Sequence, residues 1–382
     1  MKKLFLYLLP LAGLLSCDPP MEDSIETPIT VWFKGNTHAH TVVCGHADTS
    51  PDSVALWYLE QGYNFLILSE HNHFIDPETV HLPENRRSDF ILIPGEEVTG
   101  RLAIHTTGMN VHGYVEAQPE RAEGLPKETK TEMMQHHTDS ILQAGGLPIL
   151  NHPNFVSGAQ ASDILPVERL HMFELYNGHP DVHNWGNDQH AAVEVKWDSL
   201  LTAGKLILGI SSDDAHQFQT WTETTSNPGR GWVMVDSDGD LSADAITQAL
   251  AKGHFYATNG VMLSAVTPEA DVYHLTVDSA ATINALQSPY VTGKQETTGE
   301  EGFSITFIGE NGRVLQTSSR LLGEYRLNGT EKGYVRAKVR YTRKRDDGGY
   351  ESFFAWTQPL FLDERAHLLE GNEIWEAHAH TH

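Results

Sequence analysis

Seven short segments of the chain run through apolar residues and then stop at histidine or carboxylate side chains. They cover residues 35–40, 66–72, 92–97, 103–105, 149–153, 172–177 and 207–216. Each apolar run has the length of a buried strand, and helical stretches lie between several of them. Because strand ends of one polarity meet at one rim of a parallel β/α barrel, we expect the polar residues to converge there. Imidazole and carboxylate groups without a thiolate suit zinc, manganese or iron, so the pattern predicts a metal site.

The order of the elements predicts an α/β fold. Strands are expected at residues 32–40, 64–71, 89–99, 103–111, 147–152, 170–176 and 206–210, and helices at 51–62, 129–144 and 189–203. Pro51 suits a first helical turn, and the glycines after the second and third helices suit their ends. A strand at 231–235 and a helix at 242–252 follow. The alternation of strands and helices favours a parallel, barrel-like sheet.

From about residue 261 the pattern becomes that of an antiparallel sheet. Residues 334–341 alternate apolar and basic side chains, which is the period of a half-exposed strand. Hairpin turns are expected at residues 311–312 and 347–349. We therefore expect a barrel at residues 31–262, a small β-sandwich-like domain at 263–365 and a tail at 366–382. The histidines of this tail suit weak metal binding, although a solvated end is the favoured interpretation.

The first residues have the pattern of a secretory signal. Lys2 and Lys3 precede an apolar run, residues 4–15, that is too short for a permanent membrane span. The run ends Leu-Leu-Ser-Cys, which resembles the lipobox of bacterial lipoproteins, with Cys17 as the lipidated residue; the alternative is an ordinary signal with a chance cysteine. We expect a signal at residues 1–16, an acidic tether at 17–30, and a protein anchored by lipid in the cell envelope, on the periplasmic or the outer face.

Charge narrows the choice of partners. The chain has 26 basic and 51 acidic residues, and loss of Lys2 and Lys3 with the signal changes the formal charge from −25 to −27. Nucleic acid binding needs a basic surface and is therefore disfavoured. An anionic substrate would be repelled unless bound cations reversed the local field. With Cys17 lipidated, Cys44 is the remaining thiol, so no intramolecular disulfide is expected.

Three motifs together resemble those of the PHP (polymerase and histidinol phosphatase) superfamily of metal-dependent phosphoesterases, and within it the carbaryl hydrolase-like CehA/McbA branch. They are Gly-Asn-Thr-His-Ala-His at residues 35–40, Pro-Gly-Glu-Glu-Val at 94–98 and Ser-Asp-Asp-Ala-His at 212–216. The resemblance covers residues 31–260. It implies a distorted (β/α)7 barrel that holds two or three divalent metal ions (zinc, manganese or iron), followed by a β-domain.

The resemblance also implies a ligand set. By position the ligands are His38, His40, His71, Glu97, His105, His152, Asp214 and His216, with the Glu97 carboxylate bridging two ions. Spacing alone supports part of this set, because side chains two residues apart in a strand point to the same side. That applies to His38 with His40 and to Asp214 with His216.

Two positions depart from the family pattern. Glu70 stands where the family usually has aspartate, and we expect it to orient a ligand histidine; direct ligation of a metal by the longer carboxylate is the alternative. Cys-Gly-His-Ala-Asp at residues 44–48 replaces an acidic residue. We take His46 as the ligand there and Asp48 as the alternative; if neither binds, the site is binuclear.

The remaining assignments concern catalysis. A metal-bridged hydroxide would attack a small phosphate ester outside the cytoplasm, with Glu97 holding the ions and Asp214, His216 or His46 managing protons. Arg101 and Arg230 are candidate substrate clamps, with exposed surface positions as the alternative. His179 is expected to line the mouth, or to be loop surface, and Glu174 and Asn177 to support the ligands. Hydrolysis of a carboxylic or carbamate ester is the second candidate activity, and a non-catalytic ligand-binding lipoprotein the third; the oligomeric state stays open.

Overall fold

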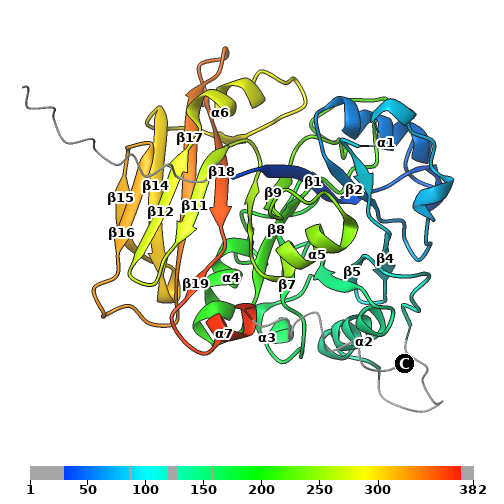
Figure 1. The fold of residues 1–382 in the computed structure, drawn as a ribbon, viewed down its shortest axis with the longest axis horizontal. Coiled ribbons are helices and arrows are strands. Elements are labelled where there is room, and N and C mark those ends of the chain that lie inside the picture. Colours follow the sequence, from blue (N-terminus) through cyan, green and yellow to red (C-terminus); the bar gives the residue numbers. More distant parts are fainter. Residues whose placement is uncertain (1–29, 87, 119–126, 157, 371–382) are drawn as a thin grey trace, which may run out of the picture.

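The computed structural model describes residues 30–86, 88–118, 127–156 and 158–370, and these form a mixed α/β molecule (Figure 1). The predicted signal, Cys17 with its tether, and the histidines of the tail lie outside the described residues. Within the described ranges, no helix combines the length and the apolar character needed to cross a membrane.

The bounds of the elements agree closely with the expected ones in the first two thirds of the chain. The helices are α1 (Pro51–Glu60), α2 (Lys130–Gln143), α3 (Ala161–Ile164), α4 (Val193–Thr202), α5 (Ala243–Ala251), α6 (Ser279–Ala285) and α7 (Arg365–Glu370). The strands as far as residue 258 are β1 (Trp32–Ala39), β2 (Phe65–Leu68), β3 (Ile91–Leu92), β4 (Gly95–Thr99), β5 (His105–Met109), β6 (Leu147–Leu150), β7 (Met172–Asn177), β8 (Leu208–Ser212), β9 (Trp232–Asp236) and β10 (Phe255–Thr258). The later strands are β11 (Leu263–Pro268), β12 (Val272–Val277), β13 (Lys294–Glu296), β14 (Gly302–Gly309), β15 (Arg313–Ser318), β16 (Leu322–Arg326), β17 (Tyr334–Lys344), β18 (Tyr350–Thr357) and β19 (Leu360–Phe361).

Local sequence explains where the helices begin. Ser50 caps α1, with Pro51 in its first turn, and Ser242 caps α5 as expected. Thr129 and Glu132 form a reciprocal capping box at the start of α2. That arrangement satisfies two backbone groups that a helix leaves free.

The strands of the first two thirds belong to two sheets. One contains β3, β2, β1, β9 and β10 in that order, and the other contains β4 to β8 in sequence order. The pairs β1–β2, β2–β3, β6–β7 and β7–β8 are parallel. The two sheets meet at two single parallel bridges, Ala39 with Ala215 and His71 with Glu97. The α/β class is therefore confirmed, whereas the hydrogen-bonded ladder of the described strands does not close into one barrel.

Two expectations about the strands need correction. The single strand expected at residues 89–99 is divided into β3 and β4, which lie in different sheets. Pro94 stands between them, and proline cannot donate to a ladder. The strand expected at 103–111 is β5, and it runs antiparallel to both β4 and β6. His105 therefore reaches the rim from the start of its strand and Glu97 from the middle of β4, while the other ligand motifs lie at or just after strand ends.

The C-terminal strands extend the first sheet. β10 pairs with β18, and β17, β14 and β15 follow, so one sheet runs from β3 to β15. A three-stranded sheet of β11, β12 and β16 packs on this extension, and one apolar cluster takes side chains from both sheets, including Tyr273, Leu275 and Phe307. Figure 1 shows these yellow and orange strands beside the part that carries β1 and β2. The C-terminal strands thus form two layers, but the larger sheet is shared with the first part of the chain, so a separate sandwich domain stays a prediction.

A buried ion pair joins the C-terminal strands to α4. Arg336 of β17 has no exposed surface, and its guanidinium donates to Asp198 at 2.9 and 2.7 Å and to Glu194 at 3.0 Å. The Tyr334 hydroxyl donates to the same Asp198 at 2.8 Å. Trp197 lies against the guanidinium, 4.8 Å from ring centroid to Cζ. A charge buried in this way stabilises the contact only while its partners are present.

Replacing Arg336 with methionine should lower the free energy of unfolding by about 3–5 kcal/mol, because the Asp198 charge loses its counter-ion, whereas Glu194 keeps Lys338. Chemical denaturation followed by circular dichroism measures the change. Arg326→Met is the control: Arg326 is exposed and pairs with Glu324 on the surface, so its loss should cost less than about 0.5 kcal/mol. Equal effects of the two substitutions would contradict the assigned role of Arg336.

Candidate metal centre

The predicted ligands converge at the rim where the two sheets meet. His38 and His40 end β1, His71 follows β2, Glu97 lies in β4, His105 begins β5, His152 follows β6, and Asp214 with His216 follows β8. Most of them are buried: the exposed fraction is 0% for His38, His40 and Glu97 and no more than 6% for His152, Asp214 and His216. The side chains of His71 and His105 are 23% and 13% exposed, so they lie toward the open side of the cluster.

Glu97 lies at the centre of the cluster, and its two oxygens face different histidines. Oε1 is 3.1 Å from His105 Nδ1, 3.2 Å from His152 Nε2 and 3.3 Å from His38 Nε2. Oε2 is 2.6 Å from His71 Nδ1 and 3.5 Å from His40 Nε2. A carboxylate placed this way can bind one cation through each oxygen, which is the geometry of a bridging ligand.

Asp214, which follows β8 at the other edge of the sheet that carries Glu97, faces the same space. Its Oδ1 lies 3.3 Å from His38 Nε2 and 3.4 Å from His40 Nε2, and those two nitrogens are 3.1 Å apart. His38, His40 and Asp214 form one group of potential ligand atoms within 4.8 Å of one another, and His38, Glu97 and His152 form a second. His40, His71 and His216 form a third. These buried groups can hold metal ions.

Glu174 and Asn177 lie behind the ligands and orient them. Glu174 accepts a hydrogen bond from His38 Nδ1 at 2.7 Å, so the Nε2 lone pair of His38 is directed at Glu97 and Asp214. The other oxygen of Glu174 accepts from the backbone N–H of His152 at 2.6 Å and from Asn177 at 2.7 Å. Asn177 also donates to Asp214 at 3.2 Å. Such contacts fix the tautomer and the direction of a ligand.

Glu70 is close to His40. One oxygen accepts from the backbone N–H of Thr41 at 2.7 Å, and the other lies 4.0 Å from His40 Nδ1 without a hydrogen-bond partner. Burial raises the pKa of Glu70 to about 7. Glu70 thus lies behind His40, but at 4.0 Å it makes no hydrogen bond to the ring, and the orienting role stays a prediction.

His46 stands over the open side of the cluster. Its ring stacks on those of His216 and His71, with centroids 4.6 and 5.1 Å apart, although the residue is exposed. Asp48, the alternative ligand, accepts hydrogen bonds from the backbone N–H groups of Phe218 and Gln219 at 2.9 and 3.1 Å. Between the two candidates, His46 is thus the one whose ring joins the histidine cluster, while Asp48 holds the loop after β8.

The three proposed substrate contacts have different surroundings. The Arg230 guanidinium donates to the carbonyls of Thr225 and Thr222 and to Asn227. It braces a loop, and is neither an open substrate clamp nor the exposed surface arginine of the alternative. Arg101 is 52% exposed on the β4–β5 loop and pairs with Glu128. The ring of His179 lies 5.9 Å from that of His216, at the edge of the cluster.

Three further residues at the site were missed from the sequence. Asn151 donates to Glu97 Oε1 at 2.9 Å, and the Thr99 hydroxyl lies 2.7 Å from His71 Nδ1. Cys44 joins two groups of potential ligands, one with His46 and His216 and one with His40 and Glu70. Its place two residues before His46, across a glycine, was the available signal, and the expectation of a site without thiolate gave it no role.

The pKa values of Glu97, His40 and His216 are shifted toward the protonation states in which these side chains bind metals. Burial would raise the pKa of Glu97, but His71, His105 and His38 hold it well below its ordinary value. Burial, together with His216, holds the pKa of His40 well below the usual range, and burial lowers that of His216 to about 4. These shifts favour the ionised carboxylate and the neutral imidazoles that metal ligation requires. Burial would lower the pKa values of His38, His71 and His152, but the neighbouring carboxylates raise them by stabilising the protonated rings.

Buried polar atoms without hydrogen-bond partners also indicate that the cluster suits a metal ion. His152 Nδ1, His216 Nε2 and Glu70 Oε2 are buried and have no hydrogen-bond partner within the described part of the chain. Most buried polar groups in folded proteins are paired, and an unpaired one is costly. A cation with an open coordination position would satisfy the free nitrogen of His216, so the donor set fits a metal centre.

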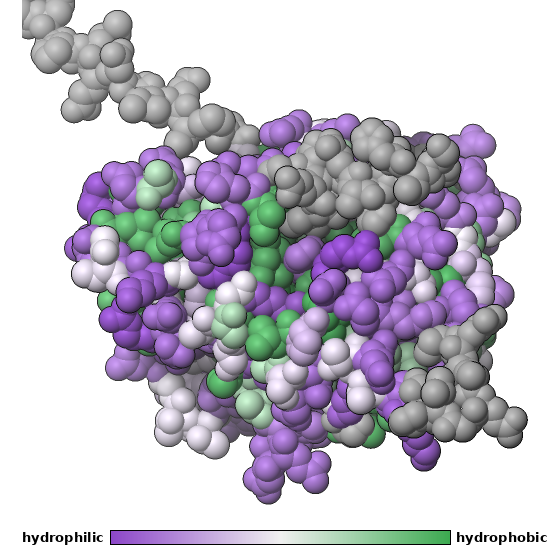
Figure 2. All heavy atoms as spheres, turned by 90° about the horizontal axis from the view of Figure 1, so that it is seen from below, coloured by the Kyte–Doolittle hydropathy of each residue, from purple (hydrophilic) through white to green (hydrophobic). Residues whose placement is uncertain are grey.

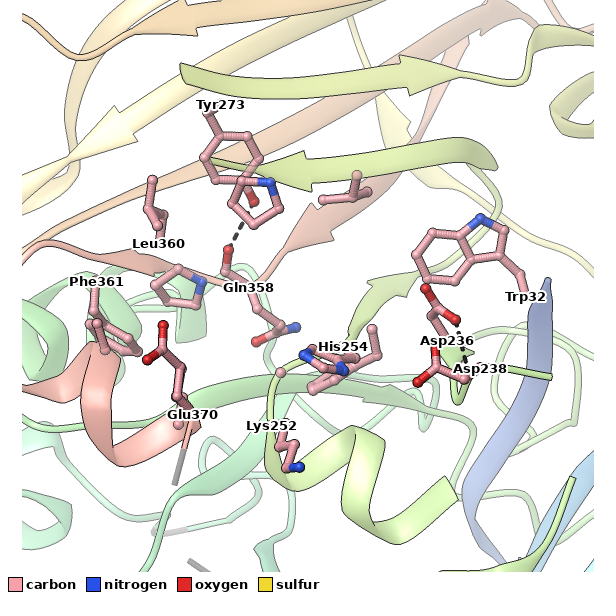
Figure 3. Close-up of a pocket in the computed structure, with 17 residues that line it drawn as sticks. Trp32, Asp236, Asp238, Lys252, His254, Tyr273, Gln358, Leu360, Phe361 and Glu370 are labelled. Atoms are coloured by element: carbon pink, nitrogen blue, oxygen red, sulfur yellow. Dashed lines mark hydrogen bonds between the residues drawn. The ribbon is translucent and has the colours of Figure 1, made fainter. Parts of the chain in front are cut away.

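A separate cavity of about 340 Å³ lies at the other end of β1. Figure 3 shows Trp32, Asp236, His254, Tyr273 and Gln358 around it. Trp32 and His38 are six residues apart along one strand, or about 20 Å. The Tyr273 hydroxyl donates to the Gln358 carbonyl at 3.0 Å, and the Gln358 amide is paired with both backbone groups of Gly209. This cavity is therefore distinct from the metal centre.

The surface is largely hydrophilic on the face that Figure 2 presents. Figure 2 shows one face on which hydrophilic side chains predominate and hydrophobic ones occupy smaller areas between them.

In comparisons with known proteins, no family model and no curated protein matches the chain.

Zinc or manganese should raise the midpoint of thermal unfolding of the chelator-treated protein, because a ligand that binds the folded state at 100 times its Kd adds about 2.7 kcal/mol. Glu97→Gln should greatly reduce this shift. Glu96→Gln is the matched control, since Glu96 points to the other side of β4 and accepts from Val115 N–H at 3.0 Å. Differential scanning fluorimetry measures the midpoints, and an undiminished shift in Glu97→Gln would count against the centre.

Proposed function

We propose that the chain is a metal-dependent hydrolase of the PHP type, with a distorted seven-stranded barrel and a CehA/McbA-like arrangement, which acts on a small phosphate ester. The observation that carries the proposal is the placement of Glu97, whose Oε1 and Oε2 face separate sets of imidazoles. The bridges Ala39–Ala215 and His71–Glu97 support the barrel interpretation, because they bring β1 next to β8 and β2 next to β4.

Two or three divalent ions, when bound, would supply Lewis acidity and lower the pKa of a water molecule so that hydroxide is available near neutral pH. Glu97, His38, His40, His71, His105, His152 and Asp214 are the residues assigned to hold the inner pair. Asp214 is also assigned to accept the proton of the attacking water, since it is ionised: burial would raise its pKa, but His38, His40 and His216 hold it well below its ordinary value.

Other residues contribute position and access. Glu174 keeps the Nε2 of His38 directed inward through the 2.7 Å hydrogen bond to Nδ1. The more exposed rings of His71 and His46 mark the side from which substrate enters. Arg101, on the loop between Glu97 and His105, is the cation assigned to bind substrate oxygens there.

Hydrolysis of a carboxylic or carbamate ester is the second candidate, and the placement of Arg230 favours it. Because Arg230 is engaged by loop carbonyls, the site has fewer free guanidinium groups for a dianionic phosphate than the sequence led us to expect. A neutral ester needs no such clamp, and the same activated water would attack its carbonyl carbon.

Glu97→Gln should abolish hydrolysis and leave the fold intact, because the amide is isosteric but carries no charge to hold two ions. The measurement is a panel of phosphomonoesters, phosphodiesters, carboxylic esters and carbamates, each assayed with zinc, manganese and iron. Glu96→Gln should keep the wild-type rate. Rates for Glu97→Gln within a few-fold of wild type would refute the bridging role, and a wild-type protein inactive on the whole panel while metal-loaded would favour a binding lipoprotein.

We also propose that Cys17 carries a lipid that anchors the protein in the cell envelope. Metabolic labelling with a fatty-acid probe should mark the wild-type protein and not Cys17→Ala, since the thiol is the acceptor. Cys44→Ala serves as the control and should be labelled like wild type. Unchanged labelling of Cys17→Ala would remove the lipobox interpretation.

A further inference from the structure

The turn after β1 places a cysteine and a histidine side by side. It consists of a short 3-10 helix, η1 (Val42–Cys44), capped by Thr41, and ends at Gly45 in the left-handed region with φ +83°. Glycine adopts this conformation without steric cost. The turn folds His46 back toward η1, and the His46 Nδ1 lies 3.2 Å from the Cys44 carbonyl oxygen.

His46 and His216 are held in the same tautomer. His216 Nδ1 lies 3.0 Å from the Asp214 carbonyl, and His46 Nδ1 is held by the Cys44 carbonyl in the same way. A ring nitrogen next to a carbonyl oxygen must be the N–H donor, so the Nε2 of each ring carries a free lone pair. His216 Nε2 is buried and has no hydrogen-bond partner. The two rings stack with an interplanar angle of 27°.

The Cys44 sulfur lies beside these two rings. Cys44, His46 and His216 each offer one ligand atom, and all three atoms lie within 4.8 Å of one another. Cys44 is also close to His40 and Glu70. That second group is a poorer ligand set, because His40 Nε2 faces Glu97 and Asp214 in the inner part of the centre, while its Nδ1 lies 4.0 Å from Glu70 Oε2.

We propose that Cys44 Sγ, His46 and His216 form a thiolate–bis-imidazole site for one further divalent ion, at the open edge of the centre. The inference rests on the proposed function in assuming that the inner positions are loaded. On binding, the Cys44 S–H bond breaks, the sulfur–metal bond forms, and the proton passes to solvent. Three protein ligands leave a fourth tetrahedral position free for water or substrate.

The sulfur gives this position its own metal preference. Thiolate ligands favour zinc over manganese, whereas the inner positions are built from imidazole and carboxylate, which serve both ions. The centre would therefore be asymmetric, with zinc selected at the outer position even where manganese occupies the inner ones.

Cobalt(II) titration of the full chain tests the site without relying on activity. Wild type and Cys17→Ser should show a near-ultraviolet sulfur-to-cobalt charge-transfer band whose final intensity corresponds to one cobalt–thiolate pair per chain. Cys44→Ser should lose the band while still binding cobalt at the inner positions, and His46→Ala should weaken it. Cobalt bound without any such band, or a band lost in Cys17→Ser and kept in Cys44→Ser, would overturn the inference and leave the proposed function standing.

A second measurement needs no variant. Iodoacetamide alkylation of Cys44, followed by mass spectrometry of the peptide that contains it, should slow at least tenfold with zinc and remain unchanged with magnesium. Equal alkylation with and without zinc would overturn the thiolate site. A protein that binds neither cobalt nor zinc in any form would instead defeat the proposed function itself.

Discussion

The burial of Glu97 among histidines is the constraint on which the rest of the centre depends. Its carboxylate is fully buried, and nitrogens of His71, His105, His152 and His38 lie within 3.3 Å of it. A charge in such a place is expensive unless opposite charge and hydrogen bonds surround it. Protons on some of the rings, or metal ions, can supply that charge. Every neighbouring element is arranged around this requirement, from the Glu174 hydrogen bond behind His38 to the Asn177 contact with Asp214.

Much of this arrangement could be predicted from the sequence, because it depends on local patterns. The apolar runs before His38, Glu97 and Asp214 predict strands with potential metal ligands at or near their ends. Because residues two apart in a strand point to the same side, His38 and His40 are neighbours in any fold that contains this strand. Features set by distant contacts were not predictable in this way. The direction of β5 depends on pairing with both β4 and β6. The guanidinium of Arg230 is held by loop carbonyls whose position follows from the whole turn after β8.

The C-terminal strands support the rim from a distance. β18 pairs with β10, β10 with β9, and β9 with β1, so the strand that carries His38 and His40 is continuous with the C-terminal sheet. Arg336 adds a second connection through Asp198 on α4. The pattern of apolar and polar residues changes near residue 261, as it would at a domain boundary. In the structure, however, strands from both sides of this position belong to the same large sheet.

The antiparallel direction of β5 has a consequence for how such a centre can diversify. β4 and β5 pair from Thr99 with His105, so Glu97 and His105 belong to one hairpin with a five-residue connection, Gly100 to Ile104. In other parts of the rim, loops can lengthen outward from a strand end without disturbing a ligand. Here an insertion would change the register that sets the spacing of two ligands. We therefore expect length variation, natural or engineered, to accumulate in the loop after β2, beyond His71, and to spare this hairpin.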